Sequence, residues 1–286
     1  MKIGIIGKGF VGSAVKFGFS PNTGVDYEVF VYDKDPSKTI NTLDETINSS
    51  DFIFISVPTP SKKSGDIDLK ILDACLSEIS ETISNERSKE AIFLIRSTIV
   101  PGSSSYFQKK YTNLRIVFNP EFLTERSANY DFISQSRYIL GGSKADTAKV
   151  ADLYKTRFGS SISIIETTFE TAELIKYMSN TFLATKVSFL NEMKILSDNV
   201  GANWEDAIEG FARDGRIGHS HMNVPGPDGK LGFGGSCFPK DIQAIINFAK
   251  QNNINLNVLS GAWKTNLEVR PERDWEKLLN RAISEE

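Results

Sequence analysis

The sequence lacks the features that define several classes of protein. It contains only 2 cysteines and 2 histidines in 286 residues. Two cysteines, Cys75 and Cys237, make no disulfide framework, so we expect a reducing, cytoplasmic compartment. No stretch approaches the roughly 18 apolar residues of a membrane span. The N-terminus has neither the apolar segment nor the cleavage site of a signal peptide.

An excess of basic residues is also missing. Lys and Arg together number 33 against 36 Asp and Glu, for a net charge of −3. A nucleic-acid-binding domain normally carries a basic surface, so this class is disfavoured. With 40% hydrophobic and 24% charged residues, the composition is that of a folded globular chain rather than a disordered one.

Short apolar runs alternate with amphipathic segments through the first half of the chain. Runs of strand length occupy residues 2–6, 29–32, 52–57, 92–95, 115–118 and 139–140. Their continuous apolar character is typical of strands buried on both faces of a parallel sheet. Residues 68–83, between two of them, have apolar side chains at helical spacing. The alternation predicts an α/β fold, a Rossmann-type doubly wound parallel sheet.

The second half is predicted to be helical. Residues 166–200 contain no Gly or Pro and carry a broad apolar stripe. A helix approaching 30 residues exceeds the usual globular length, and we expect it to act as a spine shared with a second subunit. We therefore place an α/β domain at 1–165 and an all-helical domain at 166–286. Further helices are predicted at 204–213, 241–251 and 272–282, with a long loop at 220–235.

A G-x-G-x-x-G pattern follows the first predicted strand and opens a helix. In this setting Gly7 permits the tight turn, Gly9 lets a pyrophosphate approach the backbone, and Gly12 allows close packing of helix on strand. Asp33 ends the second strand, where a carboxylate would bind a ribose 2′-OH and repel a 2′-phosphate. NAD is thus favoured over NADP, although the nearby Lys34 weakens the preference. The alternative is an ordinary turn followed by a solvated Asp.

Cys237 lies in the sequence GFGGSCFPKD at 232–241. Pro239 suits the first turn of a helix, which would place Cys237 at a helix N-terminus, where the helix dipole stabilises a thiolate. This favours an accessible nucleophile over a buried, inert thiol. Cys75 fits the inert alternative, because it lies on the apolar stripe of its helix.

These motifs and several others resemble the nucleotide-sugar 6-dehydrogenases, the family of the UDP-glucose and GDP-mannose dehydrogenases. The matching segments are GKGFVG at 7–12, SVPTP at 56–60, STIVPG at 97–102, NPEFLTE at 119–125, AELIKYMSNTFLATKVSFLNE at 172–192, RIG at 216–218 and GFGGSCFPKD at 232–241. They occur in the family's order and span most of residues 1–265.

The resemblance implies an NAD-dependent four-electron oxidation of a sugar C6 alcohol to a carboxylate, with UDP-glucose as the expected substrate. Cys237 would form a thiohemiacetal and then a thioester. Lys176 and Asn180, four residues apart on one helix face, would stabilise the oxygen at C6. Asp241 and Thr98 would position or activate water, and Glu121 would be the general base for thioester hydrolysis.

The resemblance also implies the remaining contacts and the assembly. It places NAD against Gly7, Gly9, Phe10, Val11, Gly12, Asp33, Lys38, Val57, Pro58, Thr59, Ser97, Thr98, Glu125 and Lys240. It places the nucleotide sugar against Glu121, Phe122, Leu123, Glu125, Lys176, Asn180, Arg216, Phe233 and Gly234. Arg216 would reach a neighbouring subunit's site in a homodimer built on the 167–200 helix. The role would be in polysaccharide biosynthesis.

No metal is expected, because His219 and His221 lie in a loop without an acidic or Cys partner. Two other functions stay open. A β-hydroxyacid-type dehydrogenase also joins a Rossmann domain to a helical domain but performs a two-electron oxidation without a nucleophilic thiol. A non-catalytic protein that binds NAD or a sugar nucleotide would not need Cys237.

Members of the family usually continue into a second α/β domain that closes over the nucleotide sugar. Only 45 residues follow Asp241 here, and they show no further strand–helix alternation. We therefore expect the C-terminal nucleotide-sugar-binding domain to be absent, either because the chain is a fragment or because it is a natural short form. In both cases the nucleotide site should be more open.

Overall fold

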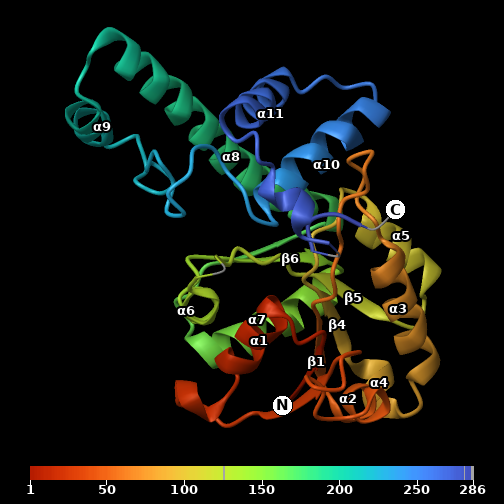
Figure 1. Cartoon of the computed structure of the whole chain (residues 1–286). Coiled ribbons are helices and arrows are strands. Elements are labelled where there is room, and N and C mark those ends of the chain that lie inside the picture. The colour runs from red at the N-terminus through yellow and green to blue at the C-terminus, as the bar shows by residue number, and fades with distance from the viewer. Residues whose placement is uncertain (125, 280, 285–286) are drawn as a thin grey trace. The chain divides into compact units, whose positions relative to one another are not determined.

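The computed structural model describes residues 1–124, 126–279 and 281–284. Its sheet has seven strands in the order β2-β1-β3-β4-β5-β6-β7 (Figure 1). The strands are β1 (Lys2–Ile6), β2 (Glu28–Tyr32), β3 (Phe52–Ile55), β4 (Ile92–Ile95), β5 (Arg115–Phe118), β6 (Tyr138–Gly142) and β7 (Ile164–Thr167). Neighbouring strands are parallel except for the antiparallel pair β5 and β6.

The strand order reverses between β1 and β3. β1 pairs with β2 on one side and with β3 on the other, so the chain crosses over in opposite directions from this point. In an open α/β sheet, ligands bind at the carboxyl ends of the strands that flank such a reversal. The fold therefore directs attention to Gly7, which follows β1, and to Val57, which lies two residues after β3.

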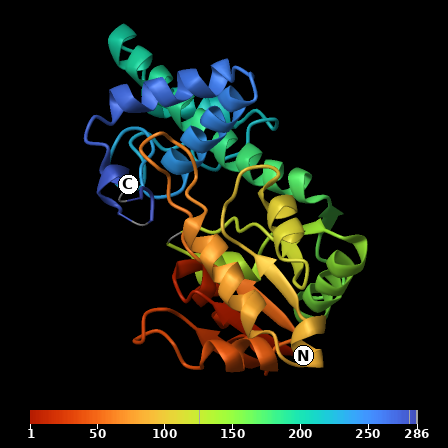
Figure 2. The same ribbon diagram turned by 90° about the vertical axis from the view of Figure 1, so that its right-hand side faces the viewer.

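Helices cover both faces of this sheet. α1 (Phe10–Gly18), α6 (Ala128–Ile133) and α7 (Lys144–Phe158) lie on one face. α3 (Lys70–Thr82) and α5 (Ser103–Lys110) lie on the other, which is turned toward the viewer in Figure 2. The short helices α2 (Leu43–Ser49) and α4 (Glu86–Glu90) and the 3-10 turn η1 (Pro21–Thr23) complete the layers.

Each central strand contributes to both cores. On β3, Phe52 and Phe54 join the core under α1 and α7, whereas Ile53 and Ile55 join the core under α3 and α5. Successive side chains of a strand point to opposite faces, so a strand covered on both sides must be apolar at every position. This is why the apolar runs identified in the sequence are continuous.

The chain divides into two compact units, one made of residues 1–59 and 69–176 and the other of residues 60–68 and 177–286. The long helix α8 (Phe169–Val200) contains the division between Lys176 and Tyr177, whereas the sequence-based boundary at 165/166 precedes this helix. Unit 2 also contains α9 (Trp204–Ala212), α10 (Phe238–Gln251), α11 (Asn257–Val269) and the 3-10 turn η2 (Asp274–Lys277).

Unit 2 has its own small core, in which Phe233 and Ile242 pack with Ala262 between α8, α10 and α11. The 60–68 loop is attached to α10, because Asp66 Oδ1 accepts hydrogen bonds from Asn247 Nδ2 at 2.6 Å and from Gln251 Nε2 at 2.7 Å. Residues 60–68 thus belong to the helical unit although they interrupt the sequence of the α/β unit.

The predicted fold class is confirmed, a Rossmann-type sheet followed by a helical region. β7 and α11 are among the elements that were not predicted individually. β7 is an edge strand with two exposed residues among its four, so it lacks a continuous apolar run. α11 turns two polar residues, Thr265 and Asn266, toward the interior, which obscures its apolar period.

The helix predicted at 272–282 is wrong. Arg273 has a left-handed backbone with φ of 42°, and of the described residues in this range only the four of η2 form a helical turn. The tail instead runs beside the 60–68 loop, where Ser61 N donates to Ala282 O at 2.9 Å and Ser284 N donates to Ser61 O at 2.8 Å. Pro271 and these strand-like bonds replace the helical ladder.

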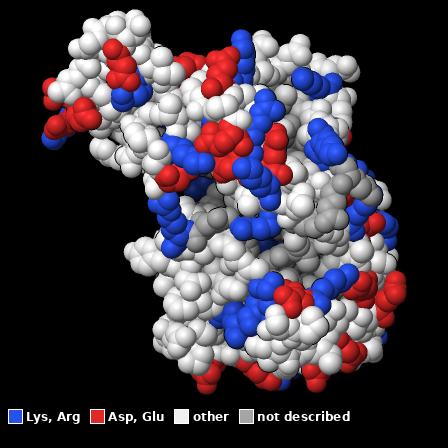
Figure 3. Space-filling model, viewed as in Figure 1, with Lys and Arg blue, Asp and Glu red and all other residues white. Residues whose placement is uncertain are grey.

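Charged side chains of both signs are intermixed on the face shown in Figure 3, in line with the near balance of Asp and Glu against Lys and Arg. Among the helices of the described ranges, none combines the length and the apolarity needed to cross a membrane.

Candidate active site

The glycines after β1 adopt the backbone that a dinucleotide requires. Gly7 has φ of 88°, and a Cβ there would lie 2.6 Å from the carbonyl oxygen of Ser56. A Cβ on Gly12 would overlap the carbonyl oxygen of Gly7, so α1 can pack this closely only with glycine at that position. Gly9, the N-cap of α1, faces open space within 4 Å.

The N-terminus of α1 is available to an anion. Its first turn contains no acidic residue, and within the described part of the chain no side chain caps it. The backbone N–H groups of a helix start carry a partial positive charge and bind phosphate. Phe10 and Val11 are the first two residues of this helix, so they supply such groups through the main chain.

Asp33 lies beside the glycine turn. Its Oδ2 accepts a hydrogen bond from Lys8 N at 2.6 Å, and its Oδ1 accepts one from Asp35 N at 2.8 Å. These bonds fix the carboxylate next to the turn and leave further lone pairs on both oxygens for hydroxyl donors. Lys38 is exposed and pairs with Asp35 at 3.2 Å.

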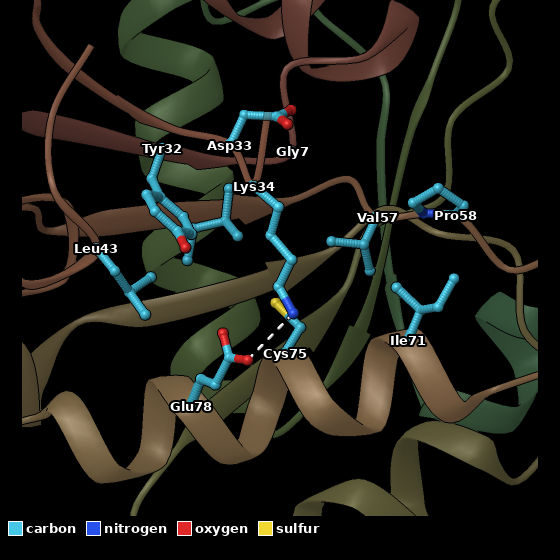
Figure 4. A pocket seen from close by; sticks show the side chains of 11 residues that line it. Gly7, Tyr32, Asp33, Lys34, Leu43, Val57, Pro58, Ile71, Cys75 and Glu78 are labelled. Atoms are coloured by element: carbon cyan, nitrogen blue, oxygen red, sulfur yellow. Dashed lines mark hydrogen bonds and ion pairs between the residues drawn. The ribbon is translucent and has the colours of Figure 1, made fainter. Parts of the chain in front are cut away.

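A hollow opens beside this turn and is closed on one side by α3 (Figure 4). Its lining residues are Ile6, Gly7, Tyr32, Asp33, Lys34, Leu43, Val57, Pro58, Ile71, Cys75 and Glu78. Ile71, Cys75 and Glu78 lie on successive turns along one face of α3. Lys34 Nζ donates a hydrogen bond to Glu78 Oε1 at 3.1 Å. The hollow is mostly apolar, as expected for a pocket that takes a flat aromatic ring.

Cys75 is the inert cysteine that the sequence analysis expected. It is 6% exposed, and burial raises the pKa of its thiol to about 12. The α3 contribution to the hollow was not anticipated, because Ile71 and Glu78 belong to no motif.

The loops after β3 and β4 are bonded to each other. Ser97 Oγ donates to Val57 O at 2.6 Å, and Thr59 Oγ1 donates to Thr98 O at 2.8 Å. Thr59, Ser97 and Thr98 are each less than 10% exposed. These bonds therefore join the two loops into one surface at the carboxyl edge of the sheet. Pro58, between Val57 and Thr59, is exposed on it.

Glu121 and Lys176 form a buried ion pair in unit 1. Lys176 Nζ donates to Glu121 Oε1 at 2.9 Å and to the Glu121 carbonyl oxygen, and the two side chains are 3% and 7% exposed. Leu123 N donates to the second carboxylate oxygen at 2.8 Å. The Phe122 ring lies 5.3 Å from Lys176 Nζ. Removing either charge would leave the other buried and unpaired, which is strongly unfavourable.

Asn119 holds the segment that carries Glu121. Its Oδ1 accepts hydrogen bonds from Arg96 Nη1 and from Tyr154 Oη, each at 2.5 Å, and its Nδ2 donates to Ile139 O at 3.0 Å. Asn119 and Arg96 are both 1% exposed. The turn after β5 is thus tied to β4, β6 and α7 by side chains rather than by the sheet ladder.

Glu173 was not singled out in the sequence and lies in the second turn of α8. The structure buries it completely and directs its carboxylate at the start of α5, where it accepts hydrogen bonds from Gly102 N at 2.6 Å and Ser104 N at 2.7 Å. Burial outweighs these hydrogen bonds and raises the pKa of Glu173 to about 7. It joins the helix of Lys176 to the segment that follows Thr98.

Unit 2 contains the other predicted catalytic residues. Cys237 is the N-cap of α10 and is partly exposed. Asp241, one turn further along, is 1% exposed; Asn180 Nδ2 donates to its Oδ2 and Lys240 Nζ donates to its Oδ1, both at 2.6 Å. A buried carboxylate with one amide and one cationic partner is held in a single orientation. Lys240, which the resemblance places against NAD, is the cationic partner in this arrangement.

The remaining predicted residues fall in different settings. Leu123 and Phe233, predicted to contact the nucleotide sugar, are 8% and 5% exposed and pack in the cores of their units. Gly234 lies against the Arg270 guanidinium. Arg216 is fully solvent-facing and pairs with Asp214 at 2.6 Å. Glu125 lies outside the described residues.

Among described residues there is no group of three or more His, Cys, Asp or Glu side chains placed to hold a metal ion.

Fold and site together define a Rossmann dinucleotide-binding unit joined to a helical unit that presents a cysteine at a helix start. Two family models match it: the NAD binding domain of the UDP-glucose/GDP-mannose dehydrogenase family at residues 37–157, and the central domain of the same family at residues 170–268. The chain therefore belongs to the UDP-glucose/GDP-mannose dehydrogenase family and carries these two domains. NAD as the cofactor is confirmed by this match, and the residues around Gly7 and Asp33 fit it.

Relatives and solved structures agree with this assignment. The UDP-glucose 6-dehydrogenase of Rickettsia prowazekii is 37% identical over 86% of this chain and 56% of that protein. A UDP-glucose dehydrogenase structure from Pyrobaculum islandicum superposes with a TM-score of 0.82 at 26% identity, over 97% of this chain and 70% of that one. The chain spans about half the length of the curated relatives that it matches.

A different dehydrogenase shares the fold alone. The 3-hydroxyisobutyrate dehydrogenase of Mycobacterium tuberculosis superposes with a TM-score of 0.74 over 95% of this chain and 94% of that one, at 14% identity. The two-unit architecture is therefore common to more than one chemistry, and only the side chains of the site can distinguish them.

For Asp33→Asn we expect roughly tenfold weaker NAD binding and a smaller preference for NAD over NADP, because a charged acceptor for the ribose hydroxyls is lost. Isothermal titration with both cofactors measures this. Asp35→Asn, two residues along and outside the hollow, is the control and should bind NAD like the parent. Unchanged NAD affinity in Asp33→Asn would show that the glycine motif has been misinterpreted.

Glu173 predicts a pH dependence of stability. The ordinary pKa of 4.5 of this carboxyl group is raised to about 7 in the folded chain. The contribution of Glu173 to the free energy of unfolding is therefore fully present below pH 4.5 and is lost as the pH rises through 7. We expect the melting temperature of the parent to fall between pH 5.5 and 8 more steeply than that of Glu173→Gln. Glu170→Gln, with an exposed carboxylate, should follow the parent. Parallel curves for parent and Glu173→Gln would contradict the assignment.

Proposed function

We propose that this protein catalyses the NAD-dependent four-electron oxidation of the C6 alcohol of a nucleotide sugar to the uronic acid, with UDP-glucose as the first candidate substrate. The curated relatives named UDP-glucose 6-dehydrogenase support this choice. We also propose that it acts in the cytoplasm, in line with its two free thiols, and supplies a precursor for polysaccharide synthesis.

One observation carries the proposal: a partly exposed cysteine begins α10, one turn before a buried Asp241 that is oriented by Asn180 and Lys240. A two-electron alcohol dehydrogenase has no use for a thiol at this position. A four-electron oxidation does, because the intermediate aldehyde must be held until the second oxidation.

NAD would accept a hydride in each of two oxidations. The glycine turn, Asp33 and the bonded loops that contain Val57, Thr59 and Ser97 would hold it. The chain's own residues handle the protons and the covalent chemistry. In the first oxidation the C6 hydroxyl loses its proton to water, and the family resemblance assigns Thr98 and Asp241 to positioning or activating water.

Cys237 Sγ then adds to the aldehyde carbon, which becomes a thiohemiacetal as its oxygen takes up a proton. The second oxidation converts this carbon to a thioester. Glu121 removes a proton from a water molecule that attacks the thioester carbon; the carbon–sulfur bond breaks and the thiolate of Cys237 is regenerated with the carboxylate product.

Lys176 and Asn180 lie one turn apart on α8, one of them a cation and the other a neutral donor. We assign them to the C6 oxygen, which carries negative charge as each tetrahedral intermediate forms. The ion pair with Glu121 suits this assignment, because it holds the ammonium in place without water.

The candidate functions differ in the number of NADH formed per nucleotide sugar. We expect two NADH per nucleotide sugar consumed by the parent and no acid product from Cys237→Ser, while NAD still binds because its site is in unit 1. Cys75→Ala, which removes the other thiol, should still form two NADH. NADH absorbance with product analysis by mass spectrometry measures both.

One NADH with a released aldehyde or ketone would support the β-hydroxyacid-type reaction. No turnover of any UDP- or GDP-sugar by the parent would support a binding protein.

We also propose a homodimer built on α8. Exposed apolar side chains recur along one stripe of this helix, with Phe182, Phe189 and Leu196 at intervals of seven residues and 46–68% exposed. Large contiguous apolar surfaces on a folded chain are typical of protein–protein interfaces. A second copy fits best, because an isologous interface needs only one such stripe.

Lysines on this stripe should separate the subunits. For Phe189→Lys/Leu196→Lys we expect at least a tenfold increase in the dimer dissociation constant, measured by sedimentation velocity over a concentration series. Asp198→Lys, about 200° around the helix from Leu196, is the control and should remain dimeric. A monomeric parent, or a double variant that dimerises like the parent, would refute the α8 interface.

A further inference from the structure

The glycine-rich segment before Cys237 does not fix its own backbone conformation. Gly232 and Gly235 have φ of 66° and 71°, a left-handed backbone that β-carbon-bearing residues rarely adopt. The segment belongs to no helix or strand, so its buried peptide groups need partners from elsewhere. Residues distant in the sequence provide them.

Asn266 on α11 binds both peptide groups of Phe233. Its Oδ1 accepts from Phe233 N at 2.7 Å, and its Nδ2 donates to Phe233 O at 3.0 Å. Asn266 is fully buried. From the other side, Asn191 of α8, which is 2% exposed, accepts from Gly232 N at 3.0 Å. Two buried amides thus take the place of a neighbouring strand.

Arg270, one turn beyond Asn266, holds the next part of the segment. Its guanidinium is 3% exposed and lies so close to Gly234 that any side chain there would overlap it. It donates to Asp274 Oδ1 at 2.6 Å, and Asp274 Oδ2 in turn accepts from Gly235 N at 3.3 Å. The glycine segment therefore packs directly against the planar guanidinium of Arg270.

The same guanidinium holds the loop upstream. Arg270 Nη2 donates to Asp228 Oδ2 at 2.6 Å, and Nη1 donates to Leu231 O at 3.3 Å. Beside this contact, Lys230 pairs with Glu272 at 3.0 Å. The chain is therefore fastened at and before the glycines, over residues 228–235, to one short stretch, residues 266–274.

We propose that Asn191, Asn266, Arg270 and Asp274 are positioning residues for Cys237. This set, the loop clamp, fixes the backbone of residues 232–235 and so presents the thiol at the start of α10. The inference rests on the proposed function, in which Cys237 is the nucleophile. Apolar residues of similar size would fill the same space, but they could not select one backbone conformation through hydrogen bonds.

The clamp is tested on the thiol itself, without reference to turnover. Asn266→Asp keeps the shape of the side chain but replaces the donor to Phe233 O by an oxygen that repels it. We expect the rate of carbamidomethylation of Cys237 by iodoacetamide at pH 7.5, followed on its peptide by mass spectrometry, to change by at least fivefold. Asp274→Asn, a milder change at a half-buried position, should change it by at least twofold.

Controls lie on the same stretch of chain. Glu268→Gln and Arg273→Gln alter exposed charges outside the clamp and should react like the parent. NAD affinity, which reports on unit 1, should be unchanged in every variant. Where turnover is measured, we expect the clamp variants to lose kcat per folded molecule while KM for NAD stays the same, with the folded fraction of each variant determined by circular dichroism.

The outcomes separate this inference from the proposed function. Parent-like alkylation rates in a folded Asn266→Asp overturn the clamp; if that variant does not fold, a parent-like rate in Asp274→Asn does so. If alkylation changes as expected but Cys237→Ser still forms two NADH per sugar, the clamp stands and the thioester chemistry fails.

Discussion

The buried ion pair of Lys176 and Glu121 is the interaction on which the organisation of unit 1 depends. Both groups are removed from water, and an isolated buried charge is so unfavourable that each needs the other. The pair joins the turn after β5 to α8, and the polar contacts of Asn119 and Glu173 hold those two elements in the positions that it requires. Apolar residues of the same volume are often at least as stable as a buried ion pair. The catalytic role that we propose for Lys176 gives a reason to keep a cation out of water beside a carboxylate.

Local rules made part of this site predictable. The strands were found because a sheet covered on both faces must be apolar throughout, and the glycine turn because its three positions are each restricted by backbone geometry. Cys237 could be placed at a helix start from Pro239 alone. These features depend on residues within about one turn of each other, which is the range over which sequence patterns are reliable.

The rest depended on contacts between distant residues. Ile71 and Glu78 line the hollow beside Asp33 only because α3 packs against β1 and β3. Glu173 looked like an ordinary acidic residue near the start of a helix, and its partners Gly102 and Ser104 are about 70 residues away. β7 and α11 were missed because one is an exposed edge and the other has a polar inner face. No local pattern contains this information.

The comparison with a protein that shares only the fold clarifies what the polar inner face of α11 is for. At 14% identity the fold is shared over almost the whole length of the 3-hydroxyisobutyrate dehydrogenase chain, so the architecture alone does not assign a function to α11. A nucleophile on a glycine-rich loop does require that the loop be held, since glycine has the largest conformational freedom to lose. In this chain Asn266 on α11 and Arg270, the residue that ends this helix, serve that purpose. A polar residue that interrupts the apolar period of α11 is thus one that holds the segment before Cys237.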